Sequence, residues 1–213
     1  MTLKITFVKL ATNSENGVTG DLTLLEGTTV IKQSTAFSGG NSFNPMDDGK
    51  YRLRLDVSGG EETNQANTDG TLKPFFGIQK VGRAVQDDQG NSYNMQVEWG
   101  TIRARLNPTG GTDHGDYIHG KQRAKDWTHG CICDRSEVIL NYLWDLTSPP
   151  AAIDVIVSGG ENFDLESLIK KNIAKRLGPD SKVIRPLKRG RGKPVSPSTF
   201  TAWRTTHFTV RQK

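Results

Sequence analysis

Residues 113–144 read DHGDYIHGKQRAKDWTHGCICDRSEVILNYLW, and this stretch joins two differently patterned parts of the chain. It holds three of the four histidines and both cysteines, all between His114 and Cys133. Upstream of it, apolar residues alternate with polar ones, as in strands; after Cys133 they recur at helical spacing. The stretch therefore predicts a strand, then a glycine-flanked loop with reactive side chains, then a helix.

Strand patterns dominate the rest of the chain. The apolar alternation or short apolar run of a strand occurs at residues 3–7, 21–26, 28–33, 51–55, 75–81, 95–106 and 153–157. Gly27 indicates a hairpin and Gly100 a bulge. Asp134 and Asp164 are candidate N-caps for two helices. Strands first and helices late predict a mainly β fold, a mixed β-sandwich with one or two flanking helices and a basic C-terminal tail.

Charge is distributed unevenly along the chain. The sequence has 28 Lys and Arg against 23 Asp and Glu, a formal net charge of +5, yet residues 182–213 contain nine basic residues and no acidic one. The body is therefore mildly acidic, which argues against a uniformly basic nucleic-acid binder, so we expect no nucleic acid as partner. The tail is open to two other roles, contact with an anionic envelope surface or docking to a delivery partner.

Cys131 is a candidate nucleophile. A thiol is mostly protonated at neutral pH, so a nucleophilic cysteine needs a base or a positive field. His119 supplies the base if its strand runs beside Cys131, and a helix beginning near Asp134 would favour the thiolate through its dipole. Gly130 lets successive amides face one point, where they would hold the oxyanion of an acyl intermediate. The stretch thus contains the parts of a cysteine acyl-transfer site.

Metal binding is the rival interpretation of the same residues. His129, Cys131 and Cys133, with His119 or His114, would supply four zinc ligands. Their spacing is not that of common zinc modules, so we expect no metal and no cofactor. Cys133 is predicted to be structural, because a disulfide between Cys131 and Cys133 would close a strained loop.

Arginines recur on two of the predicted strands, in residues 51–54 and 99–105. Arginine binds carboxylates in a bidentate manner, so these side chains are candidates for lining a substrate groove. The simpler interpretation, which we favour, is that they form the solvated face of alternating strands.

Two short motifs carry a resemblance to a known family. They are His119-Gly120 and, after a short spacer, Thr128-His129-Gly130-Cys131-Ile132. This pattern resembles the catalytic domain of L,D-transpeptidases, also called YkuD-like. A loop at residues 38–41, SGGN, and a following Pro45 and Gly49-Lys50-Tyr51 look similar to the compact L,D-transpeptidase-like effectors of type VI secretion.

The resemblance implies an L,D-transpeptidase-like fold and a reaction on the peptide stems of peptidoglycan. Such enzymes attack the carbonyl of the third stem residue, usually meso-diaminopimelate, and expel the terminal D-alanine. The thioester then passes to water, giving an L,D-carboxypeptidase, or to an amine, giving exchange or a cross-link. No cofactor or metal takes part.

The resemblance also implies a role for individual residues. Cys131 would be the nucleophile, His119 the base, and the Gly120 carbonyl would orient the imidazole. The oxyanion hole would be formed by the amides of His129, Gly130 and Cys131. Substrate contacts would come from Tyr117, Thr128 and Arg135. Arg135 is included because Cys133 stands where the family usually has Arg or Asn.

The resemblance predicts two segments and a setting. Residues 1–160 would form the catalytic domain, and residues 161–213 a C-terminal helix and basic extension. The sequence shows no signal-peptide pattern, so we expect a protein made in the cytoplasm that acts in the periplasm or cell wall of a target bacterium. An antibacterial effector would have an immunity protein and a secretion-apparatus partner. A phage-type lytic enzyme with the same fold is the alternative.

Overall fold

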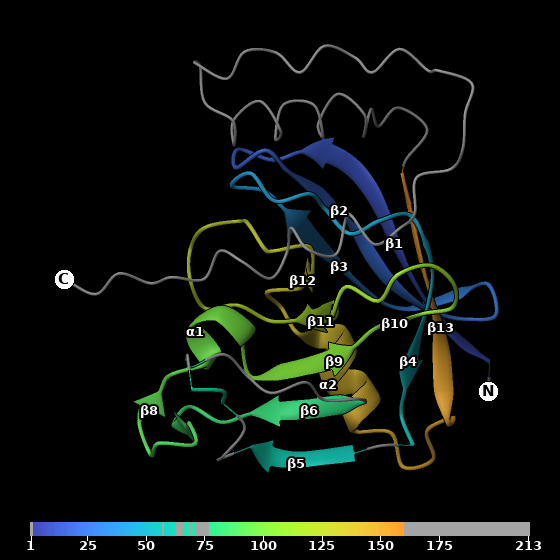
Figure 1. Ribbon diagram of the computed structural model, residues 1–213. Coiled ribbons are helices and arrows are strands. Elements are labelled where there is room, and N and C mark those ends of the chain that lie inside the picture. The colour runs from blue at the N-terminus through green and yellow to red at the C-terminus, as the bar shows by residue number, and fades with distance from the viewer. Residues whose placement is uncertain (1, 57, 63–65, 69, 71–76, 160–213) are drawn as a thin grey trace, which may run out of the picture. The chain divides into compact units, whose positions relative to one another are not determined.

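The computed structural model describes residues 2–56, 58–62, 66–68, 70 and 77–159 (Figure 1). The helix predicted after Asp164, the basic tail and the whole segment 161–213 lie outside these residues. In the part of the chain that is described, no helix is long and apolar enough to cross a membrane.

The described residues form a mainly β fold, as predicted, and contain two short helices. The strands are β1 (Leu3–Thr12), β2 (Gly17–Glu26), β3 (Thr29–Gly39), β4 (Gly49–Arg54), β5 (Ser58–Glu62), β6 (Ile78–Val81), β7 (Val85–Gln86), β8 (Ser92–Tyr93), β9 (Ile102–Arg105), β10 (Asn107–Pro108), β11 (Tyr117–His119), β12 (Ile132–Cys133) and β13 (Ala152–Gly159); the helices are α1 (Gln96–Trp99) and α2 (Val138–Trp144). Eleven strands form one mixed sheet in the order β10-β4-β13-β1-β2-β3-β12-β11-β9-β6-β5, and β7 pairs with β8.

The first three strands form an antiparallel meander, and its β2–β3 hairpin lies where Gly27 predicted one. Gly27 occupies the β2–β3 turn with a φ of +61°, a value that glycine adopts without strain. Strand β13 returns from the far end of the described chain to lie parallel to β1, and Figure 1 shows it between β1 and β4. The sheet thus brings sequence-distant segments together around one edge of the meander.

The core lies on one face of the sheet and is closed by α2. Ile139, Leu140 and Leu143 of α2 are almost fully buried and belong to the same apolar cluster as Ile118 and Ile132. In Figure 1, α2 lies behind β9 and β6, in agreement with the hydrogen bond from Lys80 on β6 to Asn141 on α2, 2.7 Å long. The central strands therefore turn alternate residues into the core and away from it.

Two local predictions are wrong. Residues 95–99 were expected to be strand, but Gln96–Trp99 is helix α1, which ends at Gly100 with a φ of +64°. Gly100 also packs closely against the backbone of Gly120, because a Cβ at position 100 would overlap the Cα of Gly120. Three alternating apolar residues are too short a pattern to separate strand from helix, and tertiary packing decides between them.

The start of α2 also differs from its predicted place. Its N-terminal flanking residue is Glu137, with a φ of +54°, and not Asp134. Asp134 is buried, and its carboxylate accepts from the backbone amide and the hydroxyl of Ser136, at 3.0 and 2.5 Å. Asp134 therefore caps a turn that precedes the helix.

Candidate active site

The face of the sheet opposite the core carries both predicted reactive groups. Ile118 on β11 lies opposite Ile132 on the parallel strand β12, and both are fully buried in the core. Side chains alternate along a strand, so His119 and Cys131, each one residue from this pair, point to the other face. They are diagonal neighbours on adjacent strands, a separation that aromatic side chains bridge. The register thus brings the predicted base and the predicted nucleophile together.

His119 is held by the backbone of the next residue. Its side chain is buried, and Nδ1 lies 2.5 Å from the carbonyl oxygen of Gly120. A carbonyl oxygen only accepts, so Nδ1 carries the proton and Nε2 remains as the basic atom of the ring. This is the contact that the resemblance implied for Gly120, and the catalytic role of both residues stays a prediction.

Gly120 packs against the side chain of Glu137, a residue that no sequence motif singles out. The backbone amide of Thr101 donates to Oε1 of Glu137 at 2.6 Å, and the Thr101 hydroxyl donates to Oε2. A Cβ at Gly120 would overlap that Oε1 atom. A side chain at position 120 would therefore have to displace the Glu137 side chain, whose carboxylate is held by Thr101.

Thr128 ties the turn before Cys131 to the end of β3. Its hydroxyl donates to the Cys131 carbonyl at 2.6 Å and accepts from the amides of Gly39, at 3.0 Å, and Gly130, at 3.3 Å. One hydroxyl has one proton and two lone pairs, so these contacts use its full bonding capacity. Thr128 is a predicted substrate contact, but in this geometry its side chain holds the turn.

Ser38 supports the same turn from β3. Its hydroxyl donates to the Gly130 carbonyl at 2.7 Å and accepts from the Met46 amide at 2.8 Å. The following Gly39 has a φ of +67°, and a Cβ there would overlap the nitrogen of Pro45. The SGGN sequence was the only signal for this role; it builds a loop that cradles residues 128–131.

The three amides predicted to form an oxyanion hole are partly engaged in this structure. The Gly130 amide donates to the Thr128 hydroxyl at 3.3 Å. Gly130 has a φ of +132°, which an L side chain rarely adopts. An oxyanion would have to draw the Gly130 amide away from Thr128, and the glycine backbone permits that rotation. The oxyanion role of His129, Gly130 and Cys131 stays a prediction.

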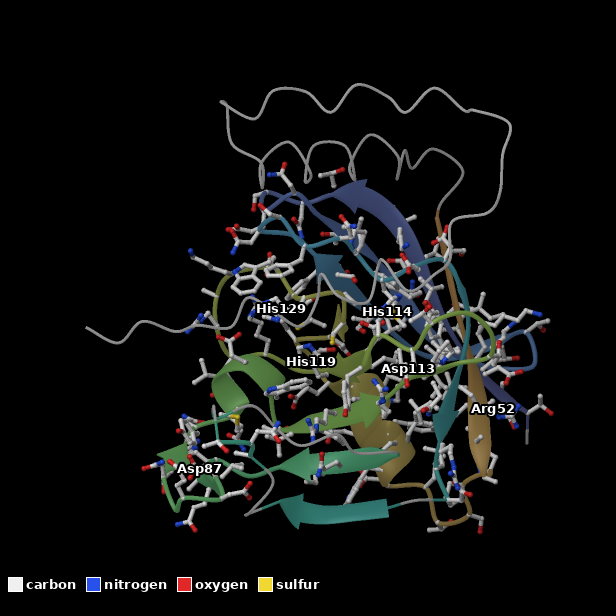
Figure 2. All side chains as sticks on the ribbon, viewed as in Figure 1. Arg52, Asp87, Asp113, His114, His119 and His129 are labelled. Atoms are coloured by element: carbon white, nitrogen blue, oxygen red, sulfur yellow. The ribbon has the colours of Figure 1, made fainter. Side chains whose placement is uncertain are left out.

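The other histidines of the stretch do not join His119. His129 is exposed and packs edge-on against Phe43, with ring centroids 4.1 Å apart. His114 is also exposed and lies 3.8 Å from a carboxylate oxygen of Asp47, and Figure 2 shows all three histidines in different orientations. Within the described ranges, no group of three His, Cys, Asp or Glu side chains converges to hold a metal ion. The zinc alternative therefore gains no support from the described residues.

Burial keeps both reactive groups neutral. Desolvation raises the pKa of the Cys131 thiol to about 12, and the carboxylate of Asp116 adds to that shift. Desolvation also lowers the pKa of His119 to about 4, against the opposing hydrogen bond to Gly120 and with the help of the positive Lys121. Helix α2 begins at Val138 and not near Asp134, and the predicted stabilisation of a thiolate by its dipole stays a prediction. The Cys131 thiol and the His119 imidazole are therefore both neutral at neutral pH.

The neutral state of His119 predicts a loss of stability in acid. The unfolded imidazole binds its proton near pH 6.5, but the folded one only near pH 4. Protonation of His119 therefore favours the unfolded state. The free energy of unfolding keeps its full value above pH 6.5 and falls by about 3 kcal/mol as the pH is lowered towards 4. Urea unfolding between pH 4 and 7 should show this loss in the wild-type protein and a shallower slope in His119→Asn. Equal slopes would contradict the prediction.

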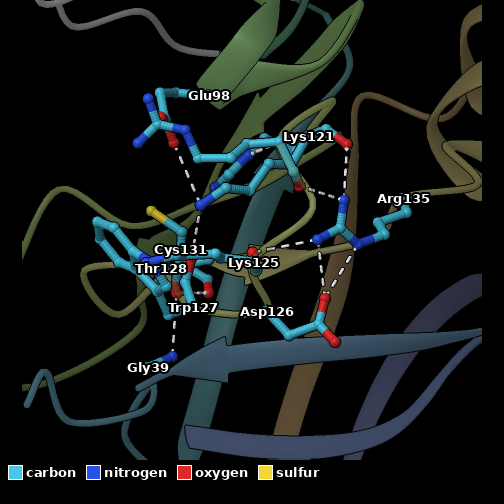
Figure 3. Close-up of polar contacts among 12 residues, drawn as sticks. Gly39, Glu98, Lys121, Lys125, Asp126, Trp127, Thr128, Cys131 and Arg135 are labelled. Atoms are coloured by element: carbon cyan, nitrogen blue, oxygen red, sulfur yellow. Dashed lines mark hydrogen bonds and ion pairs between the residues drawn. The ribbon is translucent and has the colours of Figure 1, made fainter. Parts of the chain in front are cut away.

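Arg135, a predicted substrate contact, clamps the segment between the two motifs (Figure 3). Nε and Nη2 donate to one carboxylate oxygen of Asp126, at 3.1 and 2.8 Å. The remaining donors reach the carbonyls of Lys121, Arg123 and Lys125, at 3.3, 2.5 and 3.1 Å. A guanidinium has five N–H donors, so all of them are used. Arg135 is left with no donor for a substrate carboxylate and acts here on the loop.

Arg135→Lys should open this loop, since a lysine keeps the charge but lacks the planar array of five donors. We expect trypsin to cleave after Arg123 and Lys125 about tenfold faster than in the wild type, because cleavage follows the population of the opened segment. Arg52→Lys, at an exposed arginine of β4, is the matched control and should leave that rate unchanged. Unaltered cleavage in Arg135→Lys would show that the clamp does not hold the loop.

Lys121 is a buried cation in the same loop. Its Nζ donates to the Trp127 carbonyl at 2.7 Å and lies 3.2 Å from a carboxylate oxygen of Glu98 (Figure 3). It also lies 4.5 Å from the centroid of the Trp127 ring, a cation–π contact. No sequence pattern indicates this role, which joins the loop to α1.

Tyr117, the third predicted substrate contact, lies in a buried layer of aromatic and cationic groups. Its ring packs edge-on against Trp99 of α1 at 5.3 Å, and the guanidinium carbons of Arg103 and Arg105 lie 5.0 and 5.3 Å from its centroid. Trp99 also packs 5.0 Å from the ring of His119. The Trp99 indole of α1 therefore contacts both Tyr117 and His119, the predicted base.

The prediction that the strand arginines are solvated holds on β4 only. The side chains of Arg52 and Arg54 are 58% and 48% exposed, at a shallow hollow edged by β4 and β13. Arg103 and Arg105 are instead 1% and 6% exposed, because α1 and the segment at 113–116 cover β9. Two buried arginines thus lie within two strands of Cys131.

Comparison with known proteins gives little. No family model and no curated protein matches the chain. One solved structure with a match is that of Bdellovibrio bacteriovorus Bd1075, at 13% identity and a TM-score of 0.37 over 78% of this chain. The match covers 53% of that chain, about half its length. A likeness this weak carries no argument about fold or function.

Proposed function

We propose that this protein is a cysteine acyl-transfer enzyme of the L,D-transpeptidase type that acts on peptidoglycan stem peptides. One observation carries the proposal: the β11–β12 register places Cys131 diagonally beside His119, and the Gly120 carbonyl holds the imidazole with Nε2 as its acceptor. The motif residues on which the resemblance rests are the residues that meet in this arrangement.

The arrangement supports a general-base mechanism. Nε2 of His119 accepts the thiol proton as the sulfur of Cys131 attacks the third-residue carbonyl carbon. The tetrahedral oxyanion is stabilised by amides of the turn, with Gly130 turning towards it. Collapse breaks the bond to D-alanine, whose amine takes the proton from Nε2. The thioester then passes to water or to another amine, with His119 again accepting the proton of the attacking group.

The biological setting belongs to the same proposal. We infer an antibacterial effector that works in the periplasm or cell wall of a target bacterium, with an immunity protein in the producing cell. A phage-type lytic enzyme would use the same chemistry, so the setting is tested separately. Growth of cells that produce the protein in the periplasm should stop, and a co-produced immunity protein should restore it.

The reaction is tested on purified tetrapeptide muropeptides by mass spectrometry. We expect loss of the terminal D-alanine, with tripeptide product in buffer alone and an exchanged stem when another D-amino acid is added in excess. Water as sole acceptor would define an L,D-carboxypeptidase. Intact tetrapeptides under both conditions would contradict the proposal.

A further inference from the structure

Arg105 lies in the same row across the sheet as Cys131. It is opposite Tyr117 in the β9–β11 pairing, and the β11–β12 register continues from Tyr117 to Cys131. All three side chains share the face away from the core, because Ala104, Ile118 and Ile132 fill the core side. The charge of Arg105 also acts on the Cys131 thiol, where it lowers the pKa against the larger effects of burial and Asp116. A positive group thus faces the reaction centre from two strands away.

The guanidinium of Arg105 already binds a carboxylate. Both carboxylate oxygens of Asp113 lie 2.6 Å from its Nη2 atom. The Arg105 side chain is 8% exposed while that of Asp113 is 47% exposed. Asp113 therefore lies over Arg105 on the solvent side, and Figure 2 shows it in the same region of the molecule as His119.

The segment that carries Asp113 is exposed and contains glycines at turns. Residues 109–115 are exposed, and Gly111 and Gly115 have φ values of +83° and +76°. Gly111 has open space where a side chain would be, and the Gly115 amide donates to Asp113 at 2.9 Å. Asp113 is thus an exposed anion over a buried cation.

We propose that Arg105 is a specificity-determining residue that binds a side-chain carboxylate of the acyl donor, and that Asp113 occupies its place until substrate displaces it. The inference rests on the proposed function, since it deepens the description of the same site. The exchange replaces one carboxylate with another, so the buried guanidinium is never left without a counter-charge.

Distance selects which carboxylate fits. Two strand spacings separate the backbones of Arg105 and Cys131 by about 10 Å. The α-carboxylate of the leaving residue is only about 4 Å from the attacked carbonyl carbon, whereas a carboxylate six bonds along an extended diamino diacid side chain is about 7 Å away. The Arg105 side chain, extended across the strands towards Cys131, covers the remaining distance between its backbone and that carboxylate. The substrate class is therefore an acyl donor whose diamino acid keeps its side-chain carboxylate free.

Binding is measured on the Cys131→Ala protein, which separates recognition from turnover. Three synthetic stem peptides are compared by calorimetry: the free acid, the side-chain amide and the C-terminal amide. We expect the side-chain amide to bind about tenfold more weakly than the free acid, and the C-terminal amide within about twofold of it. Asp113→Asn should tighten the free acid about tenfold and leave the side-chain amide unchanged, because the competing anion is gone.

A second variant and a control keep the result clear. Adding Arg105→Gln to Asp113→Asn leaves a neutral amide pair that avoids an unpaired charge, and it should abolish the preference for the free acid. Arg52→Gln, at an exposed arginine on β4, should leave all affinities unchanged. Equal binding of acid and side-chain amide, or a preference that follows the C-terminus, would overturn the proposal. Release of D-alanine by the wild-type protein is scored separately, so an Arg105-dependent preference without turnover would count against the reaction alone.

Discussion

Cys131→Ala is expected to abolish release of D-alanine from tetrapeptide muropeptides, with kcat/KM lower by at least about 10⁴-fold. The sulfur is the atom that forms the thioester, and the described residues around His119 offer no second exposed nucleophile, since Cys133 is fully buried. Cys131 is partly exposed and the substitution removes one atom, so the fold should be unaffected. Mass spectrometry of the digest and a thermal melt measure the two effects on one preparation.

Cys133→Ala is the matched control for this experiment. Cys133 lies opposite His119 in the register and is fully buried. It follows Cys131 by two residues and is therefore further from the turn at Gly130, whose amides are the predicted oxyanion hole. Its loss should lower the stability by about 1 kcal/mol as a small cavity in the packing, and leave D-alanine release within a fewfold of the wild-type rate. Activity that survives Cys131→Ala but not Cys133→Ala would transfer the nucleophile to Cys133 and contradict our assignment.

The second large effect is expected for His119→Asn, with kcat/KM about 10³-fold lower. The asparagine amide can still donate to the Gly120 carbonyl from a place close to that of Nδ1, so the substitution removes the base and retains the local hydrogen bond. The neutral thiol of Cys131 then has no acceptor for its proton. Its pKa of about 12 leaves almost no thiolate at neutral pH.

The pH dependence distinguishes a base from a merely structural residue. In the wild type, activity should rise between pH 3 and 5, as His119 loses its proton near pH 4, and then stay level through neutral pH. In His119→Asn it should instead rise about tenfold per pH unit above neutrality, because only direct ionisation of Cys131 remains. Rates of iodoacetamide alkylation provide an independent readout. Parallel pH profiles for the two proteins would exclude His119 as the base.

The strands of the body were predictable because their alternation is long and faces one core. Residues 3–7 and 51–55 alternate cleanly: the first segment lies in β1, the second lies in β4 up to Arg54, and their apolar members are buried except for the partly buried Leu55. The pattern at residues 95–99 is too short for a reliable prediction, since only three apolar side chains define it. There Gly100 and the packing of Trp99 on Tyr117 and His119 select a helical turn. Short patterns are decided by contacts that a sequence does not display.

The residues that hold the candidate site in place were also not predictable from local sequence patterns. Thr128 and Arg135 were assigned to substrate from their places in the motif, yet their hydroxyl and guanidinium bond backbone groups of the 121–131 segment. Glu137 and Ser38 were overlooked, because each acts through a partner that is distant along the chain, Gly120 and Gly130. Pairings of this kind arise from sheet register and loop closure, which local spacing does not specify.

By itself the sequence determined a mainly β body, the position of the meander, the helix near residue 140 and the chemical identity of a histidine and a cysteine between glycines. These follow from periodicity and residue type, which are local properties. Only the tertiary structure decided that Cys131 and His119 are diagonal neighbours, that burial holds both neutral, and that Arg105 is buried beneath an exposed Asp113. Each of these depends on which strands pair and in what register, and on the low dielectric that their packing creates.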